Sequence, residues 1–279
     1  MKKICIYGKG GIGKSTVVAN VAAAAAKAGH RVMVVGCDPK ADTTRVLMHG
    51  CMETILDIHA RMGGIGLRFE DIAKQGAFGV LCLESGGPRA GEGCAGKGIA
   101  LALQDIQEMK VIERFQPELI LYDVLGDVVC GGFSTPLRAK VADLAYIVTT
   151  LDYMSIYAAN NICGCIRKHA GRGGCRLGGL IFNERSALSG REPVETFAEG
   201  VGSRIVSVIP QDSSISASEL RRMTAVEYLP DSKAAQAFGT LAEFMLENEE
   251  ASIPKVMSGE ALENIGDEIA RRLLAEASE

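Results

Sequence analysis

A glycine-rich loop stands near the start of the chain, directly after a short apolar run at residues 3–7. Its sequence fits the phosphate-loop pattern G-x-x-x-x-G-K-S/T, with a strand expected before it and a helix after it. Glycines let successive backbone N–H groups face phosphate oxygens, and the helix N-terminus adds partial positive charge. The pattern predicts that Lys14 contacts the β- and γ-phosphates of a nucleotide and that Ser15 ligates Mg²⁺. The loop comprises Gly8, Lys9, Gly10, Gly11, Ile12, Gly13, Lys14, Ser15 and Thr16.

Carboxylates follow two further apolar runs. Asp38 and Asp42 come after residues 31–37, while Asp123 closes residues 118–123 and Asp127 follows them. The carboxyl ends of parallel strands share one edge of an open sheet, so these side chains are expected beside the phosphates. A carboxylate there can hold Mg²⁺ or orient an attacking water. Aspartate is also common in turns for conformational reasons alone, but two acidic loops beside a phosphate loop favour the functional interpretation.

Two of the nine cysteines lie in glycine-rich loops, Cys94 within residues 91–98 and Cys130 within residues 128–132. A 4Fe-4S cluster needs four thiolates, and neither cysteine belongs to a C-x-x-C pair. A homodimer would supply two thiolates from each subunit and place one cluster on its symmetry axis. The residues alone leave this interpretation level with two unpaired buried cysteines. Cys130 also lies three residues past Asp127, so one short segment would touch both nucleotide and cluster.

The other cysteines have less informative surroundings. Three of them, Cys5, Cys37 and Cys82, fall in or beside apolar strands and are expected to be small buried hydrophobes. Cys163 and Cys165 are expected on one helix but point in different directions, and with Cys175 they do not form a metal-ligand pattern. Cys51 has no informative context.

The rest of the chain alternates strand-like and helix-like segments, which predicts one doubly wound α/β domain with a mostly parallel sheet. We expect a phosphate-loop NTPase domain over residues 1–250 and a C-terminal helical tail over residues 251–279. The expected strands are residues 3–7, 31–37, 79–83, 118–123, 144–150, 177–183 and 205–209. The expected helices are residues 14–28, 98–115, 154–169, 194–201, 232–250 and 258–277.

Composition excludes several classes of protein. The chain has 279 residues, of which 47% are hydrophobic and 23% charged, so it is neither disordered nor dependent on disulfides. A net charge of −4 gives no electrostatic case for nucleic acid as a partner. The N-terminal apolar run is too short for a signal peptide, and we found no membrane-spanning stretch. These features predict a cytoplasmic protein without a membrane or nucleic-acid partner.

A second lysine in the loop, Lys9, makes the motif similar to that of the deviant P-loop ATPases. That group includes cell-division and plasmid-partition ATPases, metal-cluster carriers and the nitrogenase iron protein. Its early lysine crosses a dimer interface to the other subunit's nucleotide, so the resemblance implies a homodimer with two facing ATP sites.

Longer segments narrow the resemblance to the nitrogenase iron protein family, from residue 2 to about residue 230. The matching segments are residues 6–16, 35–42, 84–88, 93–96, 122–133, 157–162, 177–181 and 221–224. The resemblance implies a homodimer that bridges one 4Fe-4S cluster, binds MgATP in each subunit and passes single low-potential electrons to a separate catalytic component.

The family resemblance also assigns residues. It implies Cys94 and Cys130 as cluster ligands, Asp127 as the water-activating base, and Asp38 and Asp123 beside Mg²⁺. Lys9 would act across the dimer and Lys14 within its own subunit. Further nucleotide contacts would come from Lys40, Asp42, Asn183, Pro210 and Asp212.

Departures from the family pattern concern the partner more than the chemistry. Dinitrogen-reducing members carry arginine at the partner-docking position where this chain has Lys97, and Gln211 also replaces an arginine. Residues 149–153 differ as well. These differences favour a nitrogenase-like catalytic component, such as a reductase of tetrapyrroles, nickel-tetrapyrrole precursors or methylthio-alkanes. A ferredoxin or flavodoxin is expected to supply the electrons.

Two other functions share the same loop. A non-redox regulator of the partition or cell-division type would be a colourless dimer, and the acidic tail argues against its binding an anionic membrane. A cluster carrier would give up its cluster to an acceptor, but such carriers usually hold it with a C-x-x-C pair, which this chain lacks at Cys94 and Cys130.

Overall fold

The computed structural model describes the chain except for residues 64–65, 88–94, 127–133, 139, 186–189 and 277–279. The described residues form a sheet of eight strands in the order β3-β4-β2-β5-β1-β6-β7-β8. All neighbours pair in parallel except β3 and β4, which are antiparallel. The strands are β1 Lys2–Tyr7, β2 Val32–Gly36, β3 Lys74–Gln75, β4 Leu81–Glu84, β5 Leu119–Asp123, β6 Leu144–Thr149, β7 Arg176–Asn183 and β8 Ile205–Ile209. The predicted doubly wound α/β fold is confirmed.

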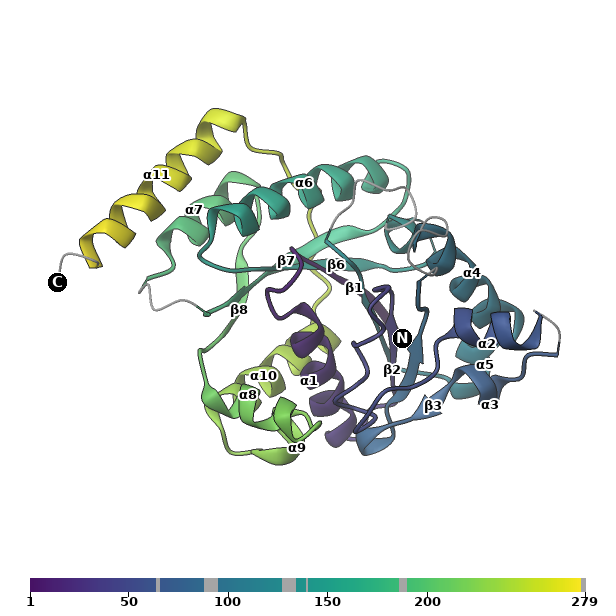
Figure 1. Cartoon of the computed structure of the whole chain (residues 1–279). Helices are drawn as coiled ribbons and strands as arrows, with labels where there is room; N and C mark the ends of the chain where they lie inside the picture. Colours follow the sequence, from purple (N-terminus) through teal and green to yellow (C-terminus); the bar gives the residue numbers. More distant parts are fainter. Residues whose placement is uncertain (64–65, 88–94, 127–133, 139, 186–189, 277–279) are drawn as a thin grey trace.

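Helices cover both faces of this sheet, as Figure 1 shows. The helix α1 packs against α10 on one face, and α6 with α7 and α11 lies on the other. The α-helices are α1 Lys14–Lys27, α2 Ile55–Met62, α3 Phe69–Ile72, α4 Ala95–Glu108, α5 Val111–Phe115, α6 Tyr153–Ala170, α7 Glu192–Gly200, α8 Ser213–Leu220, α9 Ala225–Tyr228, α10 Lys233–Glu247 and α11 Gly259–Glu276. Two short 3₁₀ helices lie at Ala77–Gly79 and Thr135–Leu137.

Alternation along β1 explains how the sheet buries both faces. Cys5 and Tyr7 point into the core cluster that includes α6 and α7, whereas Ile4 and Ile6 point into the cluster built with α1 and α10. All four side chains are fully buried. A strand covered on both sides has no polar face, which is why these runs are almost wholly apolar. Cys37 and Cys82 are buried in the same way, and the prediction for these three cysteines is confirmed.

The predicted helix over residues 98–115 is wrong in its continuity. The structure has two helices there, because Lys110 adopts a left-handed conformation with φ of 53° between α4 and α5. A lysine rarely adopts this backbone conformation, and the local hydrophobic pattern does not predict that the helix ends here. The short helices α2, α3, α8 and α9 were also not predicted.

The C-terminal segment contacts the rest of the chain through α11. Its apolar residues Leu262, Ile265 and Ile269 are buried against α6 and α7. At the surface, Tyr153 Oη donates to Glu263 at 2.6 Å. The division of the chain at residue 250 stays a prediction. None of the helices in the described part of the chain combines the length and apolar character needed to cross a membrane.

Candidate nucleotide site

The loop between β1 and α1 has the conformation that its glycines permit. Gly13 has φ of 92°, in the left-handed region that L side chains rarely adopt. A Cβ on Gly13 would also lie 2.6 Å from Asn183 Nδ2. That amide nitrogen donates to Ile12 O at 2.7 Å, so the end of β7 holds the loop in place. Asn183 therefore positions the loop as well as lining its cavity.

A buried ion pair lies at the inner end of the loop. Lys14 Nζ is 3.6 Å from Asp123 Oδ1, and the two side chains are 5% and 0% exposed. Asp123 Oδ2 accepts a hydrogen bond from Thr43 Oγ1 at 2.8 Å, whereas Oδ1 has no hydrogen-bond partner among the described residues. Burying both charges costs free energy, and the orphaned carboxylate oxygen beside a buried ammonium fits a site for phosphate and a hard cation.

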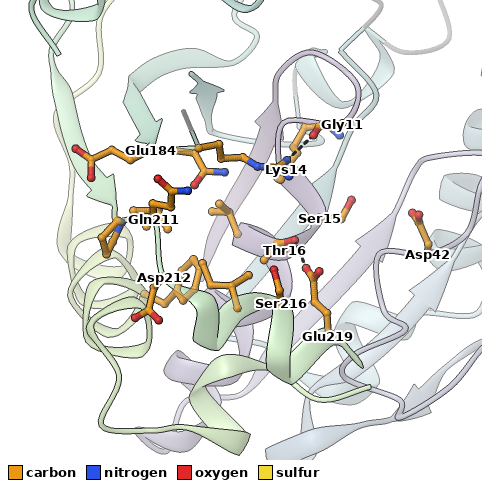
Figure 2. A pocket seen from close by; sticks show the side chains of 18 of the residues that line it. Gly11, Lys14, Ser15, Thr16, Asp42, Glu184, Gln211, Asp212, Ser216 and Glu219 are labelled. Carbon is orange, nitrogen blue, oxygen red and sulfur yellow. Dashed lines mark hydrogen bonds between the residues drawn. The ribbon is translucent and has the colours of Figure 1, made fainter. Parts of the chain in front are cut away.

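A cavity of about 400 Å³ opens over this loop. Figure 2 shows its walls, with Asp42 on one side of α1 and Gln211 and Glu184 on the other. Most of the predicted nucleotide residues line the cavity, whereas Gly8, Lys9, Ile12 and Asp123 do not. Those that do are Gly10, Gly11, Gly13, Lys14, Ser15, Thr16, Asp38, Lys40, Asp42, Asn183, Pro210 and Asp212.

The loop after β2 brings its acidic residues to the same cavity. Asp38 is 5% exposed, and its Oδ1 accepts from Lys40 N at 2.9 Å, which closes a tight turn. Asp42 is exposed and faces the cavity from the far end of that turn. The structure therefore gathers both acids of this loop beside Ser15, although from sequence each could have been a simple turn residue.

Asp212 has a structural task in addition to its place in the cavity wall. It is the N-cap of α8, where its carboxylate accepts from Ser214 N at 2.8 Å, and it also accepts from Ala234 N at 3.1 Å. The hydrogen bond from Ser214 N is the main cause that lowers the pKa of Asp212 below its usual value. A nucleoside contact by Asp212 stays a prediction.

Lys9 lies at the outer end of the loop and does not line the cavity. Its Nζ forms an ion pair at 2.9 Å with Asp152 Oδ2, and the two side chains are 39% and 48% exposed. Asp152 is also the N-cap of α6 and accepts from Met154 N. In the single chain, therefore, Lys9 does not reach its own nucleotide site.

The helix α8 supplies residues that sequence reasoning missed. Ile215, Ser216 and Glu219 line the cavity. Thr16 Oγ1 donates to Glu219 Oε1 at 2.7 Å, the contact drawn in Figure 2. Arg185 was also missed, and its Nη1 donates to Gly11 O at 2.6 Å. One signal could have found α8: β8 ends at the carboxyl edge of the sheet, where the next segment enters the site.

Comparison with known proteins decides the family. The model of the family described as "4Fe-4S iron sulfur cluster binding proteins, NifH/frxC family" matches residues 2–271. The protein belongs to this family. The nitrogenase iron protein of Methanococcus voltae is 48% identical over 269 residues, which is 96% of this chain and 97% of that protein. Nitrogenase iron protein 2 of Methanothermococcus thermolithotrophicus is 43% identical over 288 residues, covering 99% of each chain.

A solved structure with a similar fold is the septum site-determining protein MinD of Pyrococcus horikoshii in complex with Mg-ADP. It has a TM-score of 0.67 and 26% identity, and the match covers 87% of this chain and 95% of that one. The resemblance predicted from sequence is confirmed at both levels, the iron-protein family and the wider P-loop fold.

Members of this NifH/frxC family bind a 4Fe-4S cluster, and the two predicted ligands are Cys94 and Cys130. Both lie outside the described residues, as does the predicted base Asp127. Lys97 falls within the first turn of α4, but its side chain is likewise outside the description.

Proposed function

We propose that the protein is an ATP-dependent donor of single low-potential electrons to the catalytic component of a nitrogenase or nitrogenase-like enzyme. The observation that supports it most is the buried Lys14–Asp123 pair beside a cavity of about 400 Å³, in a chain that matches an iron–sulfur family over residues 2–271. The active unit is a homodimer, with MgATP in each subunit and one 4Fe-4S cluster shared between them.

The chain's own residues have distinct tasks at the nucleotide. Lys14 neutralises the β- and γ-phosphates, and the loop N–H groups orient them. Ser15 and Asp38 hold Mg²⁺, and Asp123 supports the cation through its orphaned oxygen. Asp127 orients and deprotonates the attacking water. ATP hydrolysis supplies the free energy that makes electron transfer directional.

Cys94 and Cys130 of each subunit hold the cluster, which supplies one-electron chemistry at low potential. The assignment rests on the family match and on the glycine-rich sequence around each cysteine. The same match favours an electron donor over a colourless cell-division regulator, although the MinD fold is shared.

The catalytic partner is the finer part of the proposal. The relatives named above are nitrogenase iron proteins, which supports a nitrogenase-type partner. Lys97 in place of arginine favours a nitrogenase-like reductase, because lysine cannot form the bidentate contacts of a guanidinium. Gln211 lines the nucleotide cavity, so that departure concerns the nucleotide rather than the partner. A ferredoxin or flavodoxin supplies the electrons.

Anaerobic purification tests the electron-donor proposal. The wild-type protein should be a brown dimer with about four irons per dimer. Cys94→Ser and Cys130→Ser should each lose the cluster, while Cys51→Ser, which changes an exposed cysteine, should keep it. A colourless wild-type dimer, or a full cluster in either ligand variant, would contradict the assignment.

The partner is tested by trapping the dimer with MgADP and aluminium fluoride in the presence of purified catalytic components. A nitrogenase-like component should form a stable complex and be reduced under turnover. Equal or faster reduction of a dinitrogen-reducing component would overturn the proposal of a nitrogenase-like partner. It would leave the electron-donor function unaffected.

A further inference from the structure

Two carboxylates flank one glycine at the carboxyl edge of the sheet. Gly36 at the end of β2 pairs with Glu84 of β4 on one side and with Asp123 of β5 on the other. Glu84 is fully buried, and its Oε2 has no hydrogen-bond partner among the described residues. A Cβ on Gly36 would overlap that same oxygen, so the Glu84 side chain occupies the space above the glycine.

Two consecutive threonines, in the loop that carries Asp38 and Asp42, form hydrogen bonds with these carboxylates. Thr44 N and Thr44 Oγ1 donate to Glu84 Oε1 at 2.6 Å and 2.8 Å. The preceding residue, Thr43, donates to Asp123, which faces Lys14. The loop that carries Asp38 and Asp42 is therefore fixed at its far end to two strands at once.

The residues that follow Glu84 are fitted against the beginning of the same loop. Ser85 N and Ser85 Oγ both donate to Gly36 O at 2.8 Å. Gly87 lies against Pro39, where an added Cβ would come within 2.5 Å of the proline Cβ. In the sequence, Cys94 comes seven residues after Gly87. The segment at residues 84–87 thus contacts the loop at residues 38–44 near both ends of that loop. After this segment the chain continues toward Cys94, a predicted cluster ligand.

A buried glutamate is a costly way to anchor a loop. Burial raises the pKa of Glu84 to about 8, so the side chain is a neutral acid near pH 7. Its bonds to Thr44 lower that pKa only in part, and the neighbouring Asp123 and Asp42 raise it further. A group with this cost and two hydrogen bonds to one residue of the loop fits a positioning role better than simple core filling.

We propose that Glu84 is a positioning residue, which accepts two hydrogen bonds from Thr44. Through these bonds, a change in the loop at residues 38–44 that depends on the nucleotide is passed to the segment at residues 84–87. The inference rests on the proposed function, and it adds a second connection between nucleotide and cluster. The first, predicted from sequence, is the segment from Asp123 to Cys130, which begins at the end of β5 on the other side of β2 from β4.

The test uses the cluster-loaded dimer and measures how fast an Fe²⁺ chelator removes its iron, with and without MgATP. The ratio of the two rates reports the coupling, and equilibrium dialysis reports MgATP binding separately. Glu84→Gln keeps an oxygen for Thr44 and should keep the ratio within about twofold of wild type. Glu84→Met removes both hydrogen bonds at similar length and should bring the ratio close to one, with the MgATP Kd within about threefold.

Two further variants make the result decisive. Thr44→Val removes only the hydroxyl and should lower the ratio part of the way, which settles the question if the Glu84→Met dimer does not fold. Thr224→Val removes a buried hydroxyl that caps α9 by accepting from Glu227 N, with no hydrogen bond to Glu84 or Asp123 among the described residues, and should leave the ratio unchanged. A wild-type ratio in folded Glu84→Met or in Thr44→Val would overturn the role of Glu84. A wild-type dimer without a cluster would instead overturn the proposed function.

Discussion

The two lysines of the phosphate loop, five residues apart, stand in opposite environments. Lys14 is buried beside Asp123 and its place is set by its own chain. Lys9 is partly exposed, does not line the cavity and is held by Asp152 through a surface ion pair. The inner half of the loop is therefore complete in one subunit, whereas Lys9 has no nucleotide site within its own chain. We propose that a second copy of the chain brings the nucleotide that Lys9 contacts.

The largest expected effect is at the inner lysine. Lys14→Gln removes the buried cation that faces the phosphates and should lower the rate of ATP hydrolysis by on the order of 10³. A coupled phosphate-release assay on the cluster-loaded dimer measures it. If the variant hydrolyses ATP within tenfold of wild type, the Lys14–Asp123 pair has only a structural role, and Lys14 does not act on the phosphates.

The outer lysine should matter less for binding than for turnover. Lys9→Ala should lower hydrolysis by about 10² and change the MgATP Kd of each subunit by less than about threefold, because the side chain does not reach its own site. Equilibrium dialysis beside the hydrolysis assay separates the two. A large loss of MgATP affinity would mean that Lys9 acts within its own subunit.

The raised pKa of Glu84 predicts that the stability of the protein depends on pH. Its folded pKa of about 8 lies above the ordinary value of 4.5, so the native state holds a proton that the unfolded chain has lost. This contribution is fully present below about pH 4.5 and is lost as the pH rises through 8. Wild-type protein should therefore lose more unfolding free energy between pH 5 and about pH 8.5 than Glu84→Gln. Urea titrations at each pH measure the unfolding free energy. If it changes equally with pH in the two proteins, Glu84 is charged in the native state.

A moderate effect on stability is expected at the cap shared by two helices. Asp212→Ala removes the acceptor of Ser214 N and Ala234 N and should cost about 1–2 kcal/mol of unfolding free energy. Asp212→Asn keeps one acceptor oxygen and should cost about half as much. Because the pKa of Asp212 is lowered, its contribution is present above the ordinary pKa and fades as the pH falls below it. An equal cost for both variants would show that the cap is not the source.

The smallest effect should come from releasing the outer lysine. Asp152→Asn keeps the N-cap bond to Met154 N but removes the charge that holds Lys9. An exposed pair of this kind is worth about 0–1 kcal/mol, so hydrolysis should rise by no more than about fivefold at low salt. The gain should disappear in 0.5 M salt, which screens the wild-type pair. A decrease in rate would mean that Asp152 helps Lys9 rather than restrains it.

The sequence predicted the parts of the site that are local in the chain. Gly13 and Lys14 belong to a contiguous motif whose conformation follows from glycine backbone freedom, so their positions could be derived directly. Asp38 and Asp123 could be placed because strand ends meet at one edge of a parallel sheet. The alternation of apolar runs likewise predicted the sheet, apart from β3, which is two residues long.

What could not be predicted depends on contacts between distant residues. Glu219 contacts Thr16 across 203 positions in the sequence, and no motif pairs these two residues. From sequence, Glu84 follows the strand expected at residues 79–83, and its proposed role rests on the contact with Thr44 that only the structure shows. The break at Lys110 is set by a single backbone angle, which a hydrophobic period does not encode. The proposed contact of Lys9 with the nucleotide of a second subunit involves another copy of the chain and stays a prediction.

Heterodimers with different variants in the two subunits test the central comparison most directly. Two affinity tags allow the mixed dimers to be purified, and ATP hydrolysis is the readout. A dimer of Lys9→Ala with Lys14→Gln should hydrolyse ATP at about half the wild-type rate, because the Lys9→Ala subunit keeps Lys14 and receives the partner's intact Lys9. A dimer of wild type with the Lys9→Ala, Lys14→Gln double variant should be inactive, because neither site has both lysines. The reverse pattern, with activity only in the second dimer, would show that Lys9 serves its own subunit and would contradict the account.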